Sequence, residues 1–390
     1  MPAPKRSLRI VADRNIPLVE KAFAPFGEVT ALPTTAITRE AVRSAEVLIV
    51  RSETKVTAAL LDGSPVAFVG SASIGTDHAD LDELADRGIV FANAPGCNSD
   101  SVKEYIFASL LDLAGRESFL LRGRSLGVVG VGSVGRKVAA TAAALGLSVL
   151  LNDPPRAREE GSAVFLPLDD LMTADIVTLH VPLTRSGEDA TYQLFDAGRL
   201  ARMKPGAVLI NASRGAVVPG GALKRALTGG HPGVAILDVW ENEPEVDLEL
   251  LSRTALGTAH VAGYSLEGKL NAVRLIREAF CRHFGFDAPW DPFKEIPPPA
   301  LTDIRVEPGP LQPEDILRRV VAACYDIRKD DELLRRVSAL PAKDRPDYFR
   351  GLRAEYRVRR EFSNVTVHLP RIHAGLGEAL AALGFRHRIK

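Results

Sequence analysis

Three glycines at a fixed spacing constrain the fold of this chain more than any other feature. Gly130, Gly132 and Gly135 form a GxGxxG motif that follows the apolar run 125–129 and precedes the helical run 136–146. In this context Gly130 permits a tight turn, Gly132 lets the backbone approach a pyrophosphate, and Gly135 lets helix and strand pack closely. The start of the helix directs unpaired amides at the phosphates. The motif therefore predicts a βαβ unit that binds a dinucleotide.

An acidic residue after the next apolar run favours NAD as this dinucleotide. Asp153 ends the run 148–153, where its carboxylate can accept hydrogen bonds from the adenosine ribose hydroxyls. The 2′-phosphate of NADP would meet this negative charge. We therefore expect NAD, with Val134 of the motif among its contacts. Arg156 keeps NADP open as the alternative, because an arginine at this place can bind a 2′-phosphate.

The rest of the chain alternates strand-like and helical runs. Residues 8–95 alternate short β-branched runs with amphipathic stretches, which predicts a parallel sheet covered by helices. Ser99 and Ser101 mark the start of a long helical run. Six strand-like runs then predict a second, doubly wound parallel sheet. They are 125–129, 148–153, 175–183, 207–215, 233–240 and 254–263.

A Pro-rich segment separates these runs from a C-terminal tail. After the helical run 266–284 the composition shifts abruptly to the Pro-rich stretch 288–313. The pattern of the tail predicts a helix over 313–337, a strand over 362–370 and a helix over 374–385. We therefore expect a small α/β module behind a linker.

Composition excludes several classes of protein. Lys plus Arg and Asp plus Glu each total 49, so no net charge attracts nucleic acid or an acidic membrane surface. The three cysteines, Cys97, Cys281 and Cys324, form no CxxC pair, which fits a reducing cytoplasm. The sequence has no signal-peptide pattern at its start and no apolar run long enough for a membrane span. We expect a soluble, cytoplasmic protein that uses no metal ion.

Candidate site residues, most of them polar, follow three of the predicted strands of the second sheet. In chain order they are Ala212, Ser213, Arg214, Asp238, Glu243 and His260. Doubly wound sheets bind ligands at the carboxyl ends of their strands, so we expect these side chains at one edge. Oxidising a 2-hydroxy acid requires a base for the hydroxyl proton, which we assign to His260. It also requires a cation for the carboxylate, assigned to Arg214. Glu243 would stabilise the protonated histidine.

The motifs around these residues resemble those of the D-2-hydroxyacid dehydrogenase family. INASRGAVV, LDVWENEP and GTAHVAGYS carry the resemblance, which extends over about residues 8 to 285. It implies an α/β protein with a flavodoxin-like substrate domain and a Rossmann cofactor domain, both doubly wound and parallel, plus a small C-terminal α/β dimerisation domain. The expected boundaries are 1–100 with 263–290 for the substrate domain, 101–262 for the NAD-binding domain, 291–310 for the linker and 311–390 for the tail. Arg214, Glu243 and His260 take the family's catalytic roles.

Further motifs narrow the resemblance to one branch of this family. They are IVADRNIP, VRSETKV, FVGSASIGTDH, APGCNSDSVKEYIF, LLNDPPRA, HVAGYSLEGK, GPLQP and YDIRKDD. That branch oxidises 4-phospho-D-erythronate to (R)-3-hydroxy-2-oxo-4-phosphooxybutanoate with NAD in vitamin B6 biosynthesis, and its tail pairs two subunits. The resemblance implies substrate contacts at Ser52, Ser71 and Tyr264. It implies cofactor contacts at Asp153, Val181, Ala212, Ser213, Arg214, Asp238 and Gly263.

Two residues depart from the pattern of that branch. Ser71 replaces an expected threonine but keeps the hydroxyl group. Val181 also replaces a threonine, so only its backbone could contact NAD. The substrate phosphate needs cations, and Arg51 and Lys55 flank Ser52 in a suitable loop. Both could instead be solvated surface charges. Five arginines of the tail could alternatively reach the site of a partner subunit, namely Arg350, Arg353, Arg357, Arg359 and Arg360.

Two alternative functions remain open at this point. The first is another enzyme of the family, acting on 3-phosphoglycerate, glyoxylate or hydroxypyruvate, with the tail as a regulatory domain. The second is a non-catalytic NAD sensor with the same fold. The complete set of arginine, glutamate and histidine disfavours the sensor.

Overall fold

The polypeptide forms two units, and it enters the first of them twice. The computed structural model describes residues 7–161 and 163–390. Unit 1 comprises the chain up to Asn98 together with Ser265–Pro298, and unit 2 comprises Ser99–Tyr264 together with Pro299–Lys390. The C-terminal tail therefore belongs to the same unit as the GxGxxG motif.

Unit 1 is built on a five-stranded sheet in the order β2-β1-β3-β4-β5, in which every pairing is parallel. This is the flavodoxin-like order expected from the sequence. The strands are β1 Leu8–Asp13, β2 Gly27–Leu32, β3 Val47–Val50, β4 Phe68–Ser71 and β5 Val90–Ala92. The helices are α1 Val19–Phe23, α2 Arg39–Val42, α3 Ala58–Leu61, α4 Leu81–Asp86 and α11 Leu266–Phe284.

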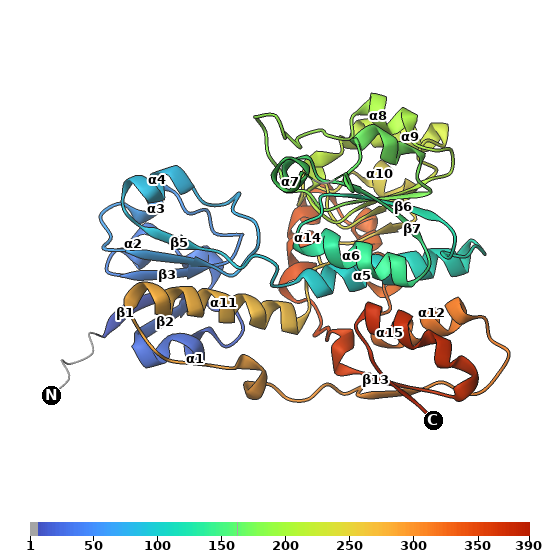
Figure 1. Cartoon of the computed structure of the whole chain (residues 1–390). Helices are drawn as coiled ribbons and strands as arrows, with labels where there is room; N and C mark the ends of the chain where they lie inside the picture. The colour runs from blue at the N-terminus through green and yellow to red at the C-terminus, as the bar shows by residue number, and fades with distance from the viewer. Residues whose placement is uncertain (1–6, 162) are drawn as a thin grey trace. The chain divides into compact units, whose positions relative to one another are not determined.

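Both faces of this sheet are covered, which explains the nearly continuous apolar strands. Helices α1 and α11 share one buried cluster with the sheet, and α2, α3 and α4 share the other (Figure 1). The long helix α11 begins where the Ser265 hydroxyl accepts a bond from the Gly268 amide, 2.8 Å away. From α11, Ile276 and Phe280 are completely buried in the first cluster. The returning segment therefore completes the core of unit 1.

Unit 2 contains a six-stranded parallel sheet in the order β11-β10-β9-β8-β6-β7. An isolated parallel bridge between Leu151 and Phe165 adds a short extended segment beside β7. That segment takes the place of the third strand in the Rossmann order 3-2-1-4-5-6. The six strands expected from the sequence are confirmed. They are β6 Ser125–Val129, β7 Ser148–Asn152, β8 Ile176–Leu179, β9 Val208–Asn211, β10 Val234–Leu237 and β11 Leu256–Gly257.

Helices cover both faces of this second sheet as well. They are α5 Ser99–Arg116, α6 Ser133–Ala144, α7 Pro154–Glu160, α8 Ala197–Arg202, α9 Gly220–Gly229 and α10 Leu248–Arg253. Helices α5 and α6 pack in one apolar cluster with the sheet, and α8, α9 and α10 pack in the other. Within the part of the chain that the structure describes, no helix is both long and apolar enough to cross a membrane.

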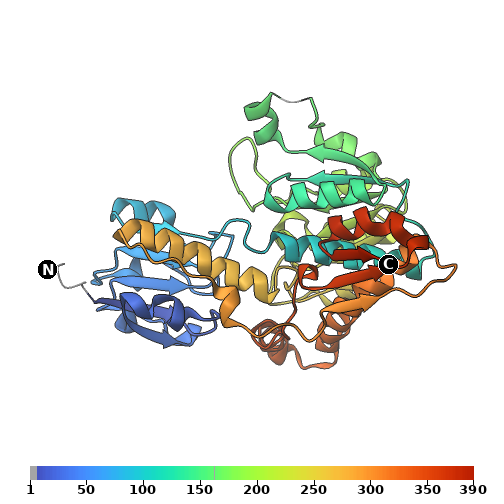
Figure 2. The ribbon, with the colours of Figure 1, turned by 60° about the horizontal axis from the view of Figure 1, so that its bottom comes forward.

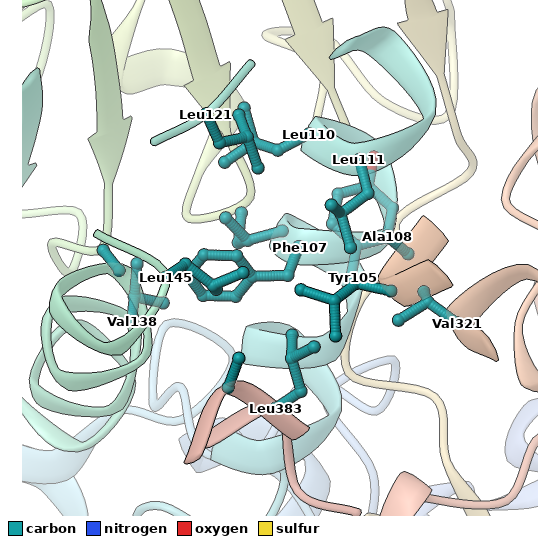
Figure 3. Close-up of a cluster of buried hydrophobic side chains, with 14 of the residues drawn as sticks. Tyr105, Phe107, Ala108, Leu110, Leu111, Leu121, Val138, Leu145, Val321 and Leu383 are labelled. Atoms are coloured by element: carbon teal, nitrogen blue, oxygen red, sulfur yellow. The ribbon is translucent and has the colours of Figure 1, made fainter. Parts of the chain in front are cut away.

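The tail packs on α5 and α6 through side chains that are almost fully buried. Its three-stranded parallel sheet has the order β12-β13-β14, formed by Asp303–Arg305, Thr366–Leu369 and Arg386–Ile389. Its helices are α12 Pro313–Cys324, α13 Arg328–Arg335, α14 Arg345–Ala354 and α15 Gly377–Leu383. Figures 1 and 2 both show α12 and α15 beside α5. In Figure 3, Val321 of α12 and Leu383 of α15 approach Tyr105 and Phe107 of α5.

Two expectations about the tail differ from the structure. The segment predicted as a linker, 291–310, contains strand β12. The helix predicted over 313–337 ends at Cys324 and restarts at Arg328. Tyr325 leaves the helical conformation and its hydroxyl donates to the Asp330 carboxylate at 2.9 Å. Burial of this ring and bond therefore overrides the local helical pattern.

Candidate active site

The GxGxxG loop has the geometry that its three glycines predict. Gly130 has a φ of 85°, and a Cβ there would lie 2.7 Å from the His180 carbonyl oxygen. A Cβ on Gly135 would lie 2.0 Å from the Gly130 carbonyl oxygen. A Cβ on Gly132 would meet no atom within 4 Å, so open space lies beside this glycine at the start of α6. The loop thus offers the room that a pyrophosphate requires.

Asp153 connects this loop to the end of β7. Its Oδ2 accepts the Val131 amide at 2.8 Å, and its Oδ1 accepts the Arg156 amide at 3.2 Å. A carboxylate can accept about four hydrogen bonds, so capacity remains for ribose hydroxyls. Arg156 is paired with Glu160 at 2.7 Å and donates to the Val131 carbonyl at 2.6 Å. Arg156, the residue that made NADP an alternative cofactor, is therefore engaged by partners within the protein.

Two valines near the loop contribute packing. Val181 lies against the loop, because its Cγ1 is 2.9 Å from the position of a Cβ on Gly130. Val134 packs against the buried cluster of α5 and α6. Neither side chain offers a hydrogen bond, so a cofactor contact from Val134 or Val181 would come from the backbone.

Asn211 organises the segment that carries Arg214. Its Nδ2 donates to the Arg214 carbonyl at 2.9 Å, and its Oδ1 accepts the amide and hydroxyl of Ser213 at 3.1 and 2.8 Å. A Cβ on Gly215 would lie 2.0 Å from the Trp240 carbonyl group. The absent side chain of Gly215 therefore lets the segment of Arg214 approach the segment that leads to Glu243. The sequence reasoning did not single out Asn211.

Asp238 organises the next segment, which carries His260. Its Oδ1 accepts the Thr258 hydroxyl at 2.6 Å and the Val261 amide at 2.8 Å, and its Oδ2 accepts the Ala262 amide at 2.9 Å. Asp238 is only 1% exposed, so these bonds are made in a dry environment. Asp238, which the sequence predicts as a cofactor contact, therefore also fixes the backbone next to His260.

His260 and Glu243 are brought together by these segments. The His260 Nδ1 lies 2.6 Å from the Glu243 Oε1, and the Glu243 Oε2 accepts the Trp240 amide at 3.2 Å. Their side chains are 29% and 26% exposed, so both reach the surface of unit 2. Burial raises the pKa of the Glu243 carboxyl, but His260 and Arg353 lower it more, so it lies below its usual value. With Nδ1 bonded to a carboxylate, Nε2 is the nitrogen left for proton transfer.

The remaining residues of this segment follow directly. Gly263 and Tyr264 come after Ala262, and both are partly exposed. The Tyr264 hydroxyl accepts a bond from Arg353 of α14 at 3.0 Å. Arg353 comes from the tail, and the sequence suggested it only as one of five tail arginines that could reach the site of a partner subunit. In the structure it contacts Tyr264 of its own chain.

The predicted substrate residues of unit 1 lie at the carboxyl ends of β3 and β4. Ser71 ends β4, and its buried hydroxyl lies 2.8 Å from the Ser73 hydroxyl and 2.9 Å from the His78 Nε2. Ser52 and Lys55 are exposed in the loop after β3.

Arg51 in the same loop is engaged by acidic partners. It pairs with the buried Asp13 at 3.2 Å and with Glu53 at 2.6 Å. Its charge is therefore already compensated, unlike that of an isolated surface arginine.

The arrangement in unit 2 suits alcohol oxidation with a dinucleotide. The glycine loop, with open space beside Gly132, follows strand β6. Glu243 follows β10 and His260 follows β11, and the two side chains are hydrogen-bonded to each other. In residues 7–161 and 163–390, no group of three His, Cys, Asp or Glu side chains is placed to hold a metal ion.

Comparison with known proteins agrees with this geometry. Residues 99–262 match the family described as D-isomer specific 2-hydroxyacid dehydrogenase, NAD binding domain, and residues 296–384 match a domain of unknown function. A D-lactate dehydrogenase from Aquifex aeolicus, solved with NAD and lactic acid, superposes with a TM-score of 0.58 and 25% identity over 74% of this chain and 95% of its own. Fold and site thus define an NAD-dependent dehydrogenase of the D-isomer specific 2-hydroxyacid class.

Full-length relatives narrow this class. The erythronate-4-phosphate dehydrogenase of Chromohalobacter salexigens is 44% identical over 98% of this chain and 99% of its own length. That of Salinibacter ruber is 46% identical over 93% of this chain and 94% of its own. The chain belongs to the erythronate-4-phosphate dehydrogenase family.

Proposed function

We propose that the protein oxidises 4-phospho-D-erythronate to (R)-3-hydroxy-2-oxo-4-phosphooxybutanoate with NAD, as a step in pyridoxine 5′-phosphate biosynthesis. The observation that carries the proposal is the 2.6 Å bond between His260 and Glu243, in the unit that also holds the open glycine loop. Similarity to erythronate-4-phosphate dehydrogenases over nearly the whole chain supports the choice of substrate. No observation favours a 3-phosphoglycerate or glyoxylate enzyme, or a non-catalytic sensor.

The roles of the residues follow from the chemistry of the reaction. The substrate loses a proton from its 2-hydroxyl group and a hydride from C2. NAD supplies the hydride acceptor. His260 accepts the hydroxyl proton at Nε2, and Glu243 stabilises the imidazolium that forms. Arg214 binds the substrate carboxylate through charge-assisted hydrogen bonds. The proton then leaves from His260 to solvent.

The NAD contacts are proposed in the same terms. The loop of Gly130, Gly132 and Gly135 would hold the pyrophosphate and Asp153 the adenosine ribose. Ala212, Ser213 and Gly263 would approach the nicotinamide half, and Asp238 would act there through the segment that it fixes by three hydrogen bonds.

The phosphate of the substrate requires compensation of a dianion. We propose Ser52 and Tyr264 as hydrogen-bonding contacts of the substrate, and Ser71 as a contact that acts through Ser73 and His78, to which its buried hydroxyl is bonded. Lys55 is the better candidate for the cation, because it is exposed, whereas Arg51 is paired with Asp13 and Glu53. Lys55→Met should therefore raise KM for the phosphorylated substrate more than Arg51→Met does at equal thermal stability.

The direct test is formation of reduced nicotinamide by purified protein with NAD and 4-phosphoerythronate. A 2-oxo acid should be present to regenerate the cofactor, since oxidation of a secondary alcohol by NAD is uphill at neutral pH. 3-Phosphoglycerate serves as the competing substrate. His260→Ala should lose several orders of magnitude in turnover while NAD binding persists. A preference for 3-phosphoglycerate, or near-normal turnover of the variant, would refute the assignment.

We also propose that the tail pairs two copies of the chain into a homodimer. The tail exposes three large apolar side chains that an interface could cover, Val358 by 74%, Ile372 by 72% and Ile389 by 51%. Aspartate at Val358 and Ile372 should give monomers by light scattering, whereas deletion of the tail would also expose the core beside α5. A protein that remains dimeric with both substitutions would contradict the proposed interface.

A cytoplasmic location is the last part of the proposal. The absence of a CxxC pair among the three cysteines and the similarity to erythronate-4-phosphate dehydrogenases support it. Cell fractionation with a periplasmic marker as control would test the location.

A further inference from the structure

Two arginines of the tail contact the segment that follows His260. Arg359 is 3% exposed, and its Nη2 donates to the Ala262 carbonyl and to the Ser101 carbonyl, both at 2.8 Å. Its guanidinium also lies 4.4 Å from the centre of the Tyr325 ring. Arg359 thereby fixes the backbone at Ala262, two residues before Tyr264.

Arg353 contacts the Tyr264 side chain itself. Its Nη2 donates to the Tyr264 hydroxyl at 3.0 Å, and its guanidinium carbon lies 5.6 Å from the centre of that ring. The ring of Tyr356 packs edge-on against the same tyrosine, with centroids 5.8 Å apart. Both the position of the phenol ring and the bond to its oxygen therefore depend on the tail.

The direction of this hydrogen bond has a chemical consequence. An arginine side chain has only donors, so the Tyr264 oxygen must act as acceptor. The hydroxyl hydrogen of Tyr264 therefore points away from Arg353. A bound substrate with a carboxylate or phosphate oxygen on that side can accept this hydrogen, and the guanidinium beside the phenol oxygen strengthens such a bond.

Arg353 also acts on the second part of the site. Its positive charge is one of the influences that lower the pKa of the Glu243 carboxyl. Arg353 therefore contacts Tyr264, which we propose as a substrate contact, and also lies close enough to Glu243 to lower the pKa of its carboxyl group.

We propose that Arg353 is a positioning residue of the dehydrogenase site, which orients the Tyr264 hydroxyl towards an anionic oxygen of the substrate. This inference rests on the proposed function, because it takes the phosphorylated hydroxy acid as the anion. It gives the domain of unknown function a part in substrate recognition that is separate from any role in subunit pairing.

The test compares two arginines of the same helix. Arg350 also lies on α14 and pairs with the exposed Asp347 at 2.7 Å, so Arg350→Met is the matched control. Arg353→Met should raise KM for 4-phosphoerythronate about tenfold, the lower end of the effect of losing one hydrogen bond to a charged group. Its kcat should change less, and NAD affinity should stay at the value of the control. Arg353→Lys, which keeps the charge and one donor, should recover part of the loss.

A double-mutant cycle with Tyr264→Phe tests whether Arg353 acts through the tyrosine. In the Tyr264→Phe background, Arg353→Met should have less than half of its effect on KM. An undiminished effect, or an Arg353→Met protein that behaves like Arg350→Met, would overturn the inference while the proposed function stands. A wild-type protein that does not oxidise 4-phosphoerythronate would instead refute the proposed function. Thermal melting of each variant identifies one that has failed to fold, and Arg353→Lys then carries the comparison.

Discussion

Replacing Glu243 by glutamine tests the central pair of the site with the smallest change in shape. The carboxylate accepts two hydrogen bonds, one from the His260 imidazole and one from the Trp240 amide. A glutamine side chain has one acceptor oxygen, and its amino group must face one of these two donors. Either the Trp240 amide loses its partner, or the imidazole turns to the tautomer with its hydrogen on Nε2. In that tautomer Nε2 cannot accept the substrate proton.

The magnitude follows from the charge of the lost partner. A hydrogen bond to a charged group contributes about 1.5–3 kcal/mol, which corresponds to a loss of about 10- to 150-fold in kcat/KM. The assay is steady-state formation of reduced nicotinamide, with NAD binding followed by fluorescence as the control. A kcat/KM within threefold of wild type, with NAD still bound, would refute the role of Glu243.

The pKa of Glu243 also predicts how pH affects this difference. Its folded-state pKa is lowered, so its ionised form contributes stability that is present above the unfolded value and is lost as pH falls through the folded value. The difference in unfolding free energy between wild type and Glu243→Gln should therefore shrink as pH falls below the unfolded pKa of about 4.3. A difference that grows as pH falls would contradict the lowered pKa.

Three further predictions concern the frame of unit 2. Gly135→Ala places a Cβ 2.0 Å from the Gly130 carbonyl oxygen, so it should lower both the melting temperature and the affinity for NAD. A Cβ on Gly132 meets no atom within 4 Å, so Gly132→Ala should lower only the affinity for NAD, measured by calorimetry. Asp238→Ala leaves the buried amides of Val261 and Ala262 without an acceptor and should cost at least about 2 kcal/mol in urea unfolding. Burial lowers the pKa of His180 to about 3, so the unfolded chain binds the extra proton. Stability should fall from about pH 6.5 towards pH 3, and less so in His180→Asn.

Local patterns in the sequence were sufficient to predict both sheets. The alternation of apolar runs and helical stretches reports parallel strands, and the glycine motif locates the turn between β6 and α6. The tail was harder, because its structure depends on distant partners. Strand β12, Asp303–Arg305, forms in a Pro-rich stretch only because β13 lies beside it. Helix α12 ends at Tyr325 because the ring is buried and bonded to Asp330, which no local signal specifies.

The candidate active site was likewise only partly predictable from the sequence. The order of Arg214, Glu243 and His260 after the glycine motif is a sequence signal, and the structure brings the last two into contact. The residues that hold them carry no such signal. Asn211 could have been noticed from its place at a strand end, next to the assigned residues. Arg353 lies 89 positions from the tyrosine that it contacts, so only the fold relates the two.

The late return of the chain into unit 1 has a consequence for protein synthesis. Helix α11, Leu266–Phe284, supplies Val273, Ile276 and Phe280 to the core that β1, β3 and β4 begin. A ribosome that adds about 5–20 residues per second therefore leaves this apolar sheet face without its helix for roughly ten seconds or longer. During that time the N-terminal segment exposes an apolar sheet face. Such a face is a binding site for chaperones that act on nascent chains.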